Sequence, residues 1–302
     1  LFKYFHYLFL ALIPAALIHA HNGWYFPIGG IAFWLVDAAI RITSSSMPCK
    51  LIAARAYEAD TGIAMLHFEK TFENPGSYCW VNVPQISLLQ WHPFSLSSSP
   101  LDGFATMHIK NMGDGEFTGK LHALIKSMEV DSQQITVNVD GPYGPPMQLD
   151  DHEVLMLIAG GIGITPIHST LRYIMHLARL NKLPPTLRIV RFTFIAKTSD
   201  MVEVFISSLQ EALETIKSQV QASATVYLTG DTSSKIEFFG FDADVVRGRP
   251  DFDMIFDDLL GELVDDETIL VKLCGPESMD AAAFAASKLR PRIVYESKAF
   301  LI

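Results

Sequence analysis

The most constraining feature of this 302-residue chain is a short apolar run that leads directly into a glycine-rich turn. Residues 155–159 read LMLIA, which is typical of a buried strand, and residues 160–166 follow as GGIGITP. Glycines let a backbone approach an anion closely, while Thr165 and Pro166 suit the cap and first position of a helix. A helix amino terminus offers free N–H groups to a phosphate. The segment therefore predicts a strand, a phosphate loop and a helix; the alternative is a tight turn that binds nothing.

The sequence after residue 150 alternates between short apolar runs and amphipathic stretches. The apolar runs are VLMLIAG, RIVRFTFIA, ATVYLTG, TILVKLCG and RIVYES, and helical patterns such as MVEVFISSLQEALETI and ESMDAAAFAASKL separate them. This alternation is typical of a parallel sheet covered by helices on both faces. We expect residues 151–302 to form an α/β nucleotide-binding domain.

The preceding part of the chain has a different pattern. Between residues 50 and 140, short β-rich runs such as TGIAMLHFE, YCWVNVPQ and ATMHIKNM are separated by turn residues, with one helix expected at about 119–128. This pattern is typical of antiparallel strands. We expect a small β-barrel domain over residues 48–150.

The amino-terminal region carries two apolar runs, residues 1–20 and 24–42, joined by a short connector around His21. Each run is about as long as a bilayer-spanning helix, which predicts a transmembrane hairpin over residues 1–42 and a polar linker at 43–48. A secretory signal and a buried soluble hairpin are the alternatives. Positive residues flank the outer ends of the hairpin, and the connector has none, so the positive-inside rule places the rest of the chain in the cytosol. These residues are Lys3, Arg41, Lys50 and Arg55.

Composition excludes several classes of function. The net charge is −10 and no basic stripe offsets it, which argues against a nucleic-acid partner. The three cysteines have neither metal-ligand nor disulfide spacing, and no Ser-His-Asp or paired-carboxylate constellation stands out. We expect Asp102, Asp114 and the acidic run 251–266 to be solvated surface. The chain begins at Leu1 rather than Met, so we expect it to be part of a longer protein.

Three further motifs follow predicted strands: HPFS at 92–95, DGPYG at 140–144 and CGP at 274–276. Each could be only a turn, but all four motifs in this order and spacing are hard to obtain by chance. On these motifs the chain resembles the ferric reductases and NADPH oxidases, whose cytosolic half is similar to ferredoxin–NADP reductase. The resemblance covers essentially the whole chain.

The resemblance implies an FAD site on the barrel. Ser95 would hydrogen-bond the isoalloxazine ring, with His92 beside it. Lys110 stands where the family has an arginine at the FAD pyrophosphate, and lysine keeps the charge but loses the bidentate fork. Phe117 replaces a family tryptophan. The implied FAD-binding residues are His92, Pro93, Phe94, Ser95, His108, Ile109, Lys110 and Thr118.

The resemblance also implies an NADPH site. Cys274 would lie near the nicotinamide C4, and Phe300 would cover the flavin. Arg249 would meet the 2′-phosphate, with Arg191 and Lys197 as weaker candidates. The phosphates and nicotinamide would be held by Gly141, Tyr143, Gly144, Gly160, Gly161, Gly163, Thr165, Pro166, Gly275 and Pro276.

Two histidines of the first apolar run, His6 and His19, have the spacing that the family uses for axial ligands of two b-type haems. Thirteen residues of helix rise roughly 20 Å, which suits two stacked haems. At about 100° per residue, however, the two side chains point some 140° apart, and His21 lies nearer the face of His6. Pro14 could kink the helix, so His21 stays a rival to His19. The opposing ligands would come from a helix absent from this chain.

Together these features predict a multi-pass protein, placed in the plasma membrane, that moves electrons from cytosolic NADPH through FAD and haem to an extracytoplasmic acceptor. The preferred acceptor is a ferric chelate, because the connector between the two apolar runs is short, whereas oxidases of the family that the chain resembles often have a longer loop that caps the outer haem. The alternatives are superoxide formation from dioxygen and a catalytically silent membrane scaffold. The sequence identifies no protein partner.

Overall fold

The computed structural model describes residues 8–19, 25–45, 48–57, 61–69, 71–128, 135–145, 147, 149, 152–230, 242–264 and 266–299. The chain divides into two compact units, Leu1–Pro48 and Cys49–Ile302. Three predicted site residues, His6, His21 and Phe300, lie outside the described residues.

The first unit contains helices α2 (Phe9–His19) and α3 (Tyr25–Ser45). Pro14 lies inside α2, and α3 continues through Ser45, so the linker expected from residue 43 is helical at its start. Many large apolar side chains on both helices are exposed, among them Leu12, Ile18, Phe33 and Trp34. No helix in the described part of the chain is both long and apolar enough to cross a bilayer, so the membrane hairpin stays a prediction.

The first half of the second unit contains two antiparallel sheets around one apolar core. A three-stranded sheet has the order β2-β3-β6, and a four-stranded sheet has the order β1-β7-β4-β5. The strands are β1 (Pro48–Cys49), β2 (Leu51–Ala56), β3 (Ile63–Phe68), β4 (Tyr78–Asn82), β5 (His92–Ser95), β6 (Ala105–Lys110) and β7 (Val137–Tyr143). A 3-10 turn η1 (Pro100–Asp102) joins β5 to β6, and helix α4 (Phe117–Ser127) follows. The expected antiparallel strands are present, whereas closure into a barrel is not established.

The second half is a six-stranded parallel sheet with the order β11-β10-β9-β8-β12-β13. Its strands are β8 (Val154–Gly160), β9 (Ile189–Ala196), β10 (Gln221–Leu228), β11 (Asp244–Arg247), β12 (Ile269–Gly275) and β13 (Ile293–Ala299). Every residue of the central strand β8 is buried. The expected parallel α/β sheet is confirmed.

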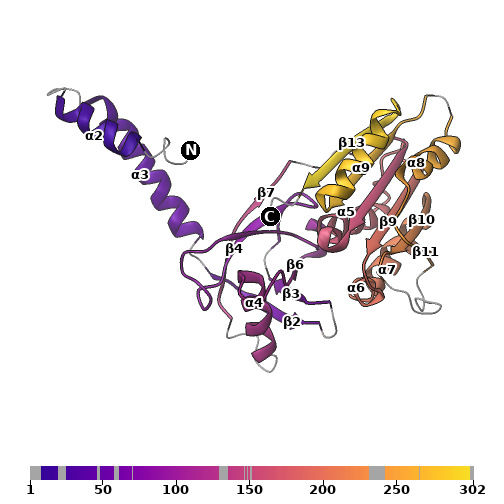
Figure 1. The fold of residues 1–302 in the computed structure, drawn as a ribbon, viewed down its shortest axis with the longest axis horizontal. Helices are drawn as coiled ribbons and strands as arrows, with labels where there is room; N and C mark the ends of the chain where they lie inside the picture. Colours follow the sequence, from indigo (N-terminus) through magenta and orange to yellow (C-terminus); the bar gives the residue numbers. More distant parts are fainter. Residues whose placement is uncertain are drawn as a thin grey trace. The chain divides into compact units, whose positions relative to one another are not determined.

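Helices cover both faces of this sheet (Figure 1). On one face lie α5 (Ile164–Arg179), α6 (Ser199–Glu203) and α7 (Ile206–Lys217), and on the other lie α8 (Phe252–Gly261) and α9 (Glu277–Lys288). Parallel strands bring their carboxyl ends to one edge, where ligands of such sheets bind. The predicted glycine loop and the CGP motif both lie at that edge.

Candidate functional site

The glycine loop follows β8 as expected and forms a 3-10 turn, η3 (Gly161–Gly163), before α5. Gly161 has a φ of 55°, in the left-handed region that favours glycine, and no atom lies within 4 Å of the position of an added Cβ. The loop therefore presents bare backbone at the amino end of α5, the end of a helix that favours an anion.

Gly163 is required by close packing against the end of β12. A Cβ at this position would lie 2.2 Å from the carbonyl oxygen of Cys274 and 3.0 Å from the nitrogen of Gly275. Gly160 and Gly275 also lie against each other, because the Cα of Gly160 is 3.2 Å from the Cβ position of Gly275. The glycines thus bring the GG-x-G and CGP motifs into direct contact.

The predicted capping of this helix is wrong. Helix α5 begins at Ile164, Gly163 occupies the cap without a side-chain bond, and Pro166 stands at the third helical position rather than the first. The Thr165 hydroxyl instead donates to the carbonyl oxygen of Ile162 at 3.1 Å. Proline is tolerated anywhere in the first turn, because the N–H groups there have no partner within the helix.

The HPFS motif forms β5, and its two rings pack against the buried Phe117. The His92 ring stacks on Phe117 with ring centroids 4.3 Å apart, and Phe94 lies 6.2 Å from Phe117. Burial lowers the pKa of His92, although the nearby Glu116 opposes the change. Its buried Nε2 has no hydrogen-bond partner among the described residues. Phe117, the replacement for the family tryptophan, is therefore in stacking contact with the motif.

His108 lies on β6 and faces the second half of the unit. Its Nδ1 is 2.7 Å from the Ser97 hydroxyl, and its ring lies against Tyr57 and Phe205. Although part of the side chain is exposed, this enclosure lowers the pKa of His108 to about 3, with a smaller effect of His168. In the neutral ring, Nδ1 is therefore engaged with the Ser97 hydroxyl.

The other implied FAD residues are distributed over the surroundings of β5 and β6. Ile109 is 2% exposed and packs in the core of the sheets, so only its backbone can face a ligand. Lys110 lies on the same face of β6 as His108, opposite the buried residues of that strand. Thr118 accepts a hydrogen bond from the Met112 backbone, and Pro93 is exposed.

The GPYG motif ends β7. Gly141 has a φ of 140°, and a Cβ there would lie 3.0 Å from the Cys79 sulfur, so a larger residue would be both strained and crowded. Gly144 also has a positive φ, of 128°. The Tyr143 hydroxyl donates to Asp140 at 2.8 Å.

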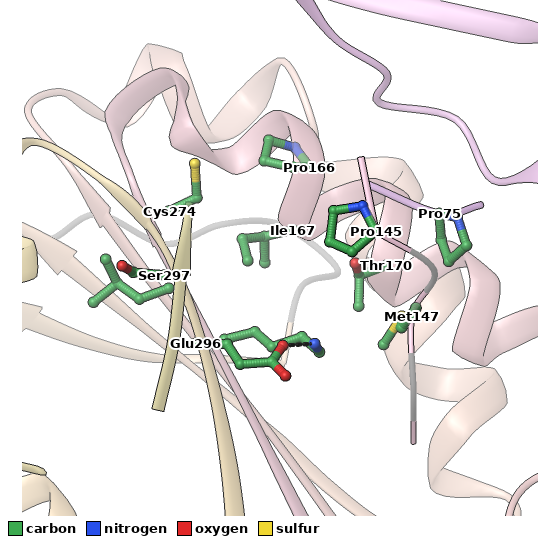
Figure 2. A pocket seen from close by; sticks show the side chains of 11 residues that line it. Pro75, Pro145, Met147, Pro166, Ile167, Thr170, Cys274, Glu296 and Ser297 are labelled. Atoms are coloured by element: carbon green, nitrogen blue, oxygen red, sulfur yellow. Dashed lines mark hydrogen bonds and ion pairs between the residues drawn. The ribbon is translucent and has the colours of Figure 1, made fainter. Parts of the chain in front are cut away.

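A cavity of about 540 Å³ lies between the two halves of the second unit (Figure 2). Pro166, Ile167 and Thr170 project into it from α5, and Cys274 lies at its edge at the end of β12. The remaining walls are Pro75, Pro145, Met147, Lys272, Leu273, Glu296 and Ser297. Lys272 forms an ion pair with Glu296 on the neighbouring strand. Residues within or next to three predicted motifs, GPYG, GG-x-G-x-TP and CGP, thus meet at one cavity.

The candidate cations for a 2′-phosphate are separated by the sheet. Ala196, Leu228 and Arg247 share one register row at the carboxyl ends of β9, β10 and β11. Lys197 and Arg249 follow that row and are exposed. Arg191 is instead near the amino end of β9, where it pairs with Glu262. The edge of the sheet therefore carries Lys197 and Arg249, but not Arg191.

Of the proposed haem ligands, only His19 is described; it is the exposed last residue of α2. No group of three or more possible metal ligands occurs among the residues that the structure describes.

One functional residue was misjudged from the sequence. Asp102 was expected to be solvated surface, but its side chain is 1% exposed and accepts a forked ion pair from Arg172. It also closes a capping box with Ser99 at the start of η1. The S-x-x-D spacing of Ser99 and Asp102 was the available signal for that cap.

The chain matches two protein-family models. The FAD-binding domain matches residues 49–147, and the ferric reductase NAD binding domain matches residues 152–238. The chain belongs to the ferric reductase and NADPH oxidase family. The flavin and nucleotide halves expected from the motifs are confirmed at the level of these domains.

Relatives of both kinds are found. A superoxide-generating NADPH oxidase heavy chain from Dictyostelium discoideum is 28% identical over 95% of this chain and 61% of its own length. The probable ferric reduction oxidase 1 of Arabidopsis thaliana is 33% identical over 60% of this chain and 26% of its own length. The chain therefore spans less than two thirds of either relative.

Solved structures support the fold. The ferredoxin NADP⁺ reductase of Neisseria gonorrhoeae has a TM-score of 0.59 and 12% identity, over 83% of this chain and 98% of that one. The FAD/NAD binding domain of nitric oxide dioxygenase from Vibrio cholerae has a TM-score of 0.57 and 16% identity, with the same coverage. At these identities the similarity establishes a ferredoxin–NADP reductase-like fold.

Proposed function

We propose that the chain is the electron-input part of a membrane flavohaem reductase, which takes electrons from NADPH and delivers them to an acceptor across the membrane. One observation carries this proposal: Pro145, Pro166 and Cys274, each beside or within a different motif, line a single cavity. Bound FAD would supply the conversion between the two-electron hydride of NADPH and the single electrons that haem accepts.

The antiparallel half fits a flavin. The half-buried rings of His92 and Phe94 are backed by the buried ring of Phe117, and the buried Nε2 of His92 lacks a partner among the described residues. An isoalloxazine ring presents both a flat face and polar edge atoms, which match these two features. Ser95 lies on the same strand to hydrogen-bond that edge, and Lys110 is the cation for the pyrophosphate.

The sheet half fits a dinucleotide that runs along its carboxyl edge. Gly160, Gly161 and Gly163 expose backbone to phosphates at the start of α5. Arg249, helped by Lys197, would bind the 2′-phosphate beyond β9–β11. The nicotinamide would then reach the cavity at the opposite end of this edge, against Cys274.

The cavity residues orient the reactants and exclude water. The side chains of Pro75, Pro145, Pro166, Ile167 and Met147 make most of the wall apolar. Cys274, 1% exposed, presents a small sulfur-bearing side chain that sets how closely a nicotinamide approaches the flavin. Phe300 would close the flavin side.

A first experiment measures electron input. The purified 302-residue chain in detergent is loaded with FAD, mixed anaerobically with NADPH, and followed by loss of flavin absorbance. Cys274→Ala should slow this reduction while FAD binding stays intact. Absence of FAD uptake at millimolar concentration, or a flavin that NADPH leaves oxidised, would reject the proposal.

Two acceptors are supported by different observations. The matched nucleotide domain is described as that of ferric reductases, which favours a ferric chelate. A superoxide-generating oxidase, in contrast, aligns with 95% of the chain, which favours dioxygen. A parallel assay of ferric-chelate reduction and superoxide release by the full-length protein separates the two.

The proposal also places the amino-terminal helices in a membrane, where they would contribute haem ligands. Exposed apolar side chains on α2 and α3, such as Leu12, Phe33 and Trp34, fit an apolar surrounding such as lipid. His6 and His19 would be ligands of the inner and outer haem, each completed by a helix outside this chain. One described histidine does not make a bis-histidine site, so the assignment rests on the resemblance.

Haem spectra of full-length variants test these ligands. His6→Ala and His19→Ala should each remove one haem without preventing flavin reduction by NADPH. His21→Ala should keep both haems. Loss of haem in His21→Ala but not in His19→Ala would transfer the outer ligand to His21, and full haem content in all three variants would reject ligation by this segment.

A further inference from the structure

The segment that follows the HPFS motif lies along the side of α5. Ser97, Ser98 and Asp102 all contact side chains of that helix, although the two segments are about 70 residues apart in the sequence. The same helix begins at the glycine loop. Helix α5 therefore joins the glycine loop at its amino end to the segment that directly follows the HPFS motif along its side.

The contacts come from one face of α5, at positions 168, 169, 172 and 176. His168 Nδ1 lies 2.6 Å from the Ser97 carbonyl oxygen, and the Ser169 hydroxyl donates to the Ser98 carbonyl at 2.5 Å. Spacings of three and four residues place side chains on one side of a helix. The helix thus holds the backbone of the segment as well as its side chains.

The strongest contact is the ion pair at the end of η1. Arg172 donates from Nε and Nη2 to the two oxygens of Asp102, at 2.9 and 2.6 Å, and His176 Nε2 lies 2.6 Å from Oδ1. The second oxygen also accepts the Ser99 backbone N–H at 2.7 Å. Arg172 further reaches the Ser208 hydroxyl on α7 at 2.8 Å. A planar guanidinium bound through two nitrogens fixes orientation as well as distance.

Burial makes this contact hard to exchange. The side chain of Asp102 is 1% exposed, and those of Arg172 and His176 are 15% and 18% exposed. A carboxylate enclosed in this way cannot replace a lost partner with water, so it holds the two segments in one arrangement. Burial opposes its ionisation, but bonds from Arg172, His176 and Ser99 keep the pKa of Asp102 below its usual value.

We propose that Asp102, Arg172 and His176 form a positioning clamp that fixes the distance between the flavin motif on β5 and the nucleotide loop at the start of α5. The clamp rests on the proposed function, because the distance it fixes would be that between flavin and nicotinamide. Neither Asp102 nor Arg172 lines the cavity, so both act through the elements that they join. An error of about 1 Å in such a distance lowers a rate by up to roughly a hundredfold.

The test variant removes the two-nitrogen contact of Arg172 with Asp102 but keeps the positive charge. Arg172→Lys should slow the limiting rate of flavin reduction by NADPH on the order of tenfold, since lysine cannot hold both oxygens at once. The long-wavelength charge-transfer absorbance of the flavin–nicotinamide complex should weaken. The dissociation constants of FAD and NADPH should stay within about twofold, because the variant leaves the ligand contacts in place. His176→Gln, which keeps one donor, should be milder than His176→Leu.

Arg290→Lys is the matched control. Arg290 binds Asp253 and Asp257 in a similar fork, but the two aspartates lie on α8 and Arg290 follows α9 directly, all within the nucleotide half. This variant should change neither the rate nor the charge-transfer band. Equal, unchanged rates and bands in Arg172→Lys and Arg290→Lys would reduce Asp102 and Arg172 to a stabilising ion pair and overturn the clamp.

A second measurement separates the clamp from the proposed function. If NADPH leaves the flavin of the wild-type chain oxidised, the proposed function fails, and amide hydrogen exchange without any nucleotide then decides on the clamp. Faster exchange in Arg172→Lys over both residues 97–103 and α5 supports it, and unchanged exchange in either segment overturns it. The same measurement on Asp102→Asn gives a second variant if Arg172→Lys does not fold.

Discussion

Arg172 and Arg290 make nearly the same bonds in two different regions of the molecule. Each guanidinium is bound by aspartate oxygens at 2.6–3.1 Å, and both arginine side chains are mostly buried. The difference lies in the carboxylates: Asp102 is 1% exposed, whereas Asp253 and Asp257 are 62% and 65% exposed. The first pair joins the two halves of the unit, and the second joins neighbouring helices.

The direction of a pKa shift does not distinguish the two regions, because it is the same in both. Hydrogen bonds from Arg290 lower the pKa of Asp257, and bonds from Arg172 lower that of Asp102 against the effect of burial. Water can replace Arg290 beside an exposed carboxylate, but no solvent reaches Asp102. Ion pairs of the first kind contribute little to stability, whereas breaking the second kind leaves a buried charge alone.

The largest effect is therefore expected for Asp102→Ala. Removal of this carboxylate leaves the mostly buried Arg172 without its main partner. This change should lower the free energy of unfolding by about 3–5 kcal/mol. Urea unfolding of the FAD-free chain measures the change. A loss below about 1 kcal/mol would show that solvent reaches this pair and would abolish the contrast with Arg290.

The second effect concerns pH at the same interface. Burial lowers the pKa of His168 to about 4 and that of His108 to about 3, with His168 adding to the latter. The unfolded chain has the ordinary value of 6.5, so below that pH it takes up protons that the folded state refuses. The free energy of unfolding should then fall by about 1.4 kcal/mol per pH unit for each histidine, until the pH nears the folded value.

His168→Gln isolates one of these protons. The slope of unfolding free energy against pH, from 6 to 5, should be shallower by about 1.4 kcal/mol per unit in this variant. Identical slopes in variant and wild type would mean that His168 is protonated in the folded protein. The interface would then be wetter than its geometry indicates.

The third effect concerns Arg249, an exposed cation proposed to bind the 2′-phosphate of NADPH. Arg249→Ala should raise KM for NADPH more than for NADH, by a factor equivalent to about 1.5–3 kcal/mol, since one charge-assisted bond to the 2′-phosphate is lost. Steady-state kinetics with both nucleotides measure it. Equal changes for the two nucleotides would remove Arg249 from phosphate recognition and leave Lys197 as the candidate.

The smallest effect is expected for Asp257→Ala. Its carboxylate is open to solvent, so the urea midpoint should match that of the wild type within error. A clear loss of stability would show that the α8–α9 cluster acts as a unit, and the comparison with Asp102 would then concern position rather than burial.

The strands and helices that have a local apolar pattern could be predicted from the sequence. Alternating apolar runs identified the strands around β8 and the helices between them, because each run is buried over its whole length or most of it. Strand β11 was missed because all four of its residues are exposed and leave no apolar pattern. The segment read as one helix is two, α6 and α7, with a break that neither glycine nor proline marks.

The site was predicted to a similar extent. Motifs that consist of neighbouring residues, such as the glycine loop, were located at the expected edge of the sheet. Asp102 was misjudged because its burial depends on Arg172 and His176, some 70 positions away, and no local signal reports such partners. The contact between His108 Nδ1 and the Ser97 hydroxyl could not be predicted either, because the two residues lie on different segments and neither is marked by a local pattern.

The strand order has a consequence for how the protein is made. Strand β8 pairs on one side with β9, which follows soon after it, but on the other side with β12, about 115 residues later. At roughly 5–20 residues per second, a ribosome needs about 6–23 s to supply that second neighbour. During this time the growing chain carries an apolar strand with one uncovered edge, the kind of surface that attracts chaperones and other nascent chains. The exposed edge of β8 is therefore covered only once β12, and not merely β9, has been synthesised and has paired with it.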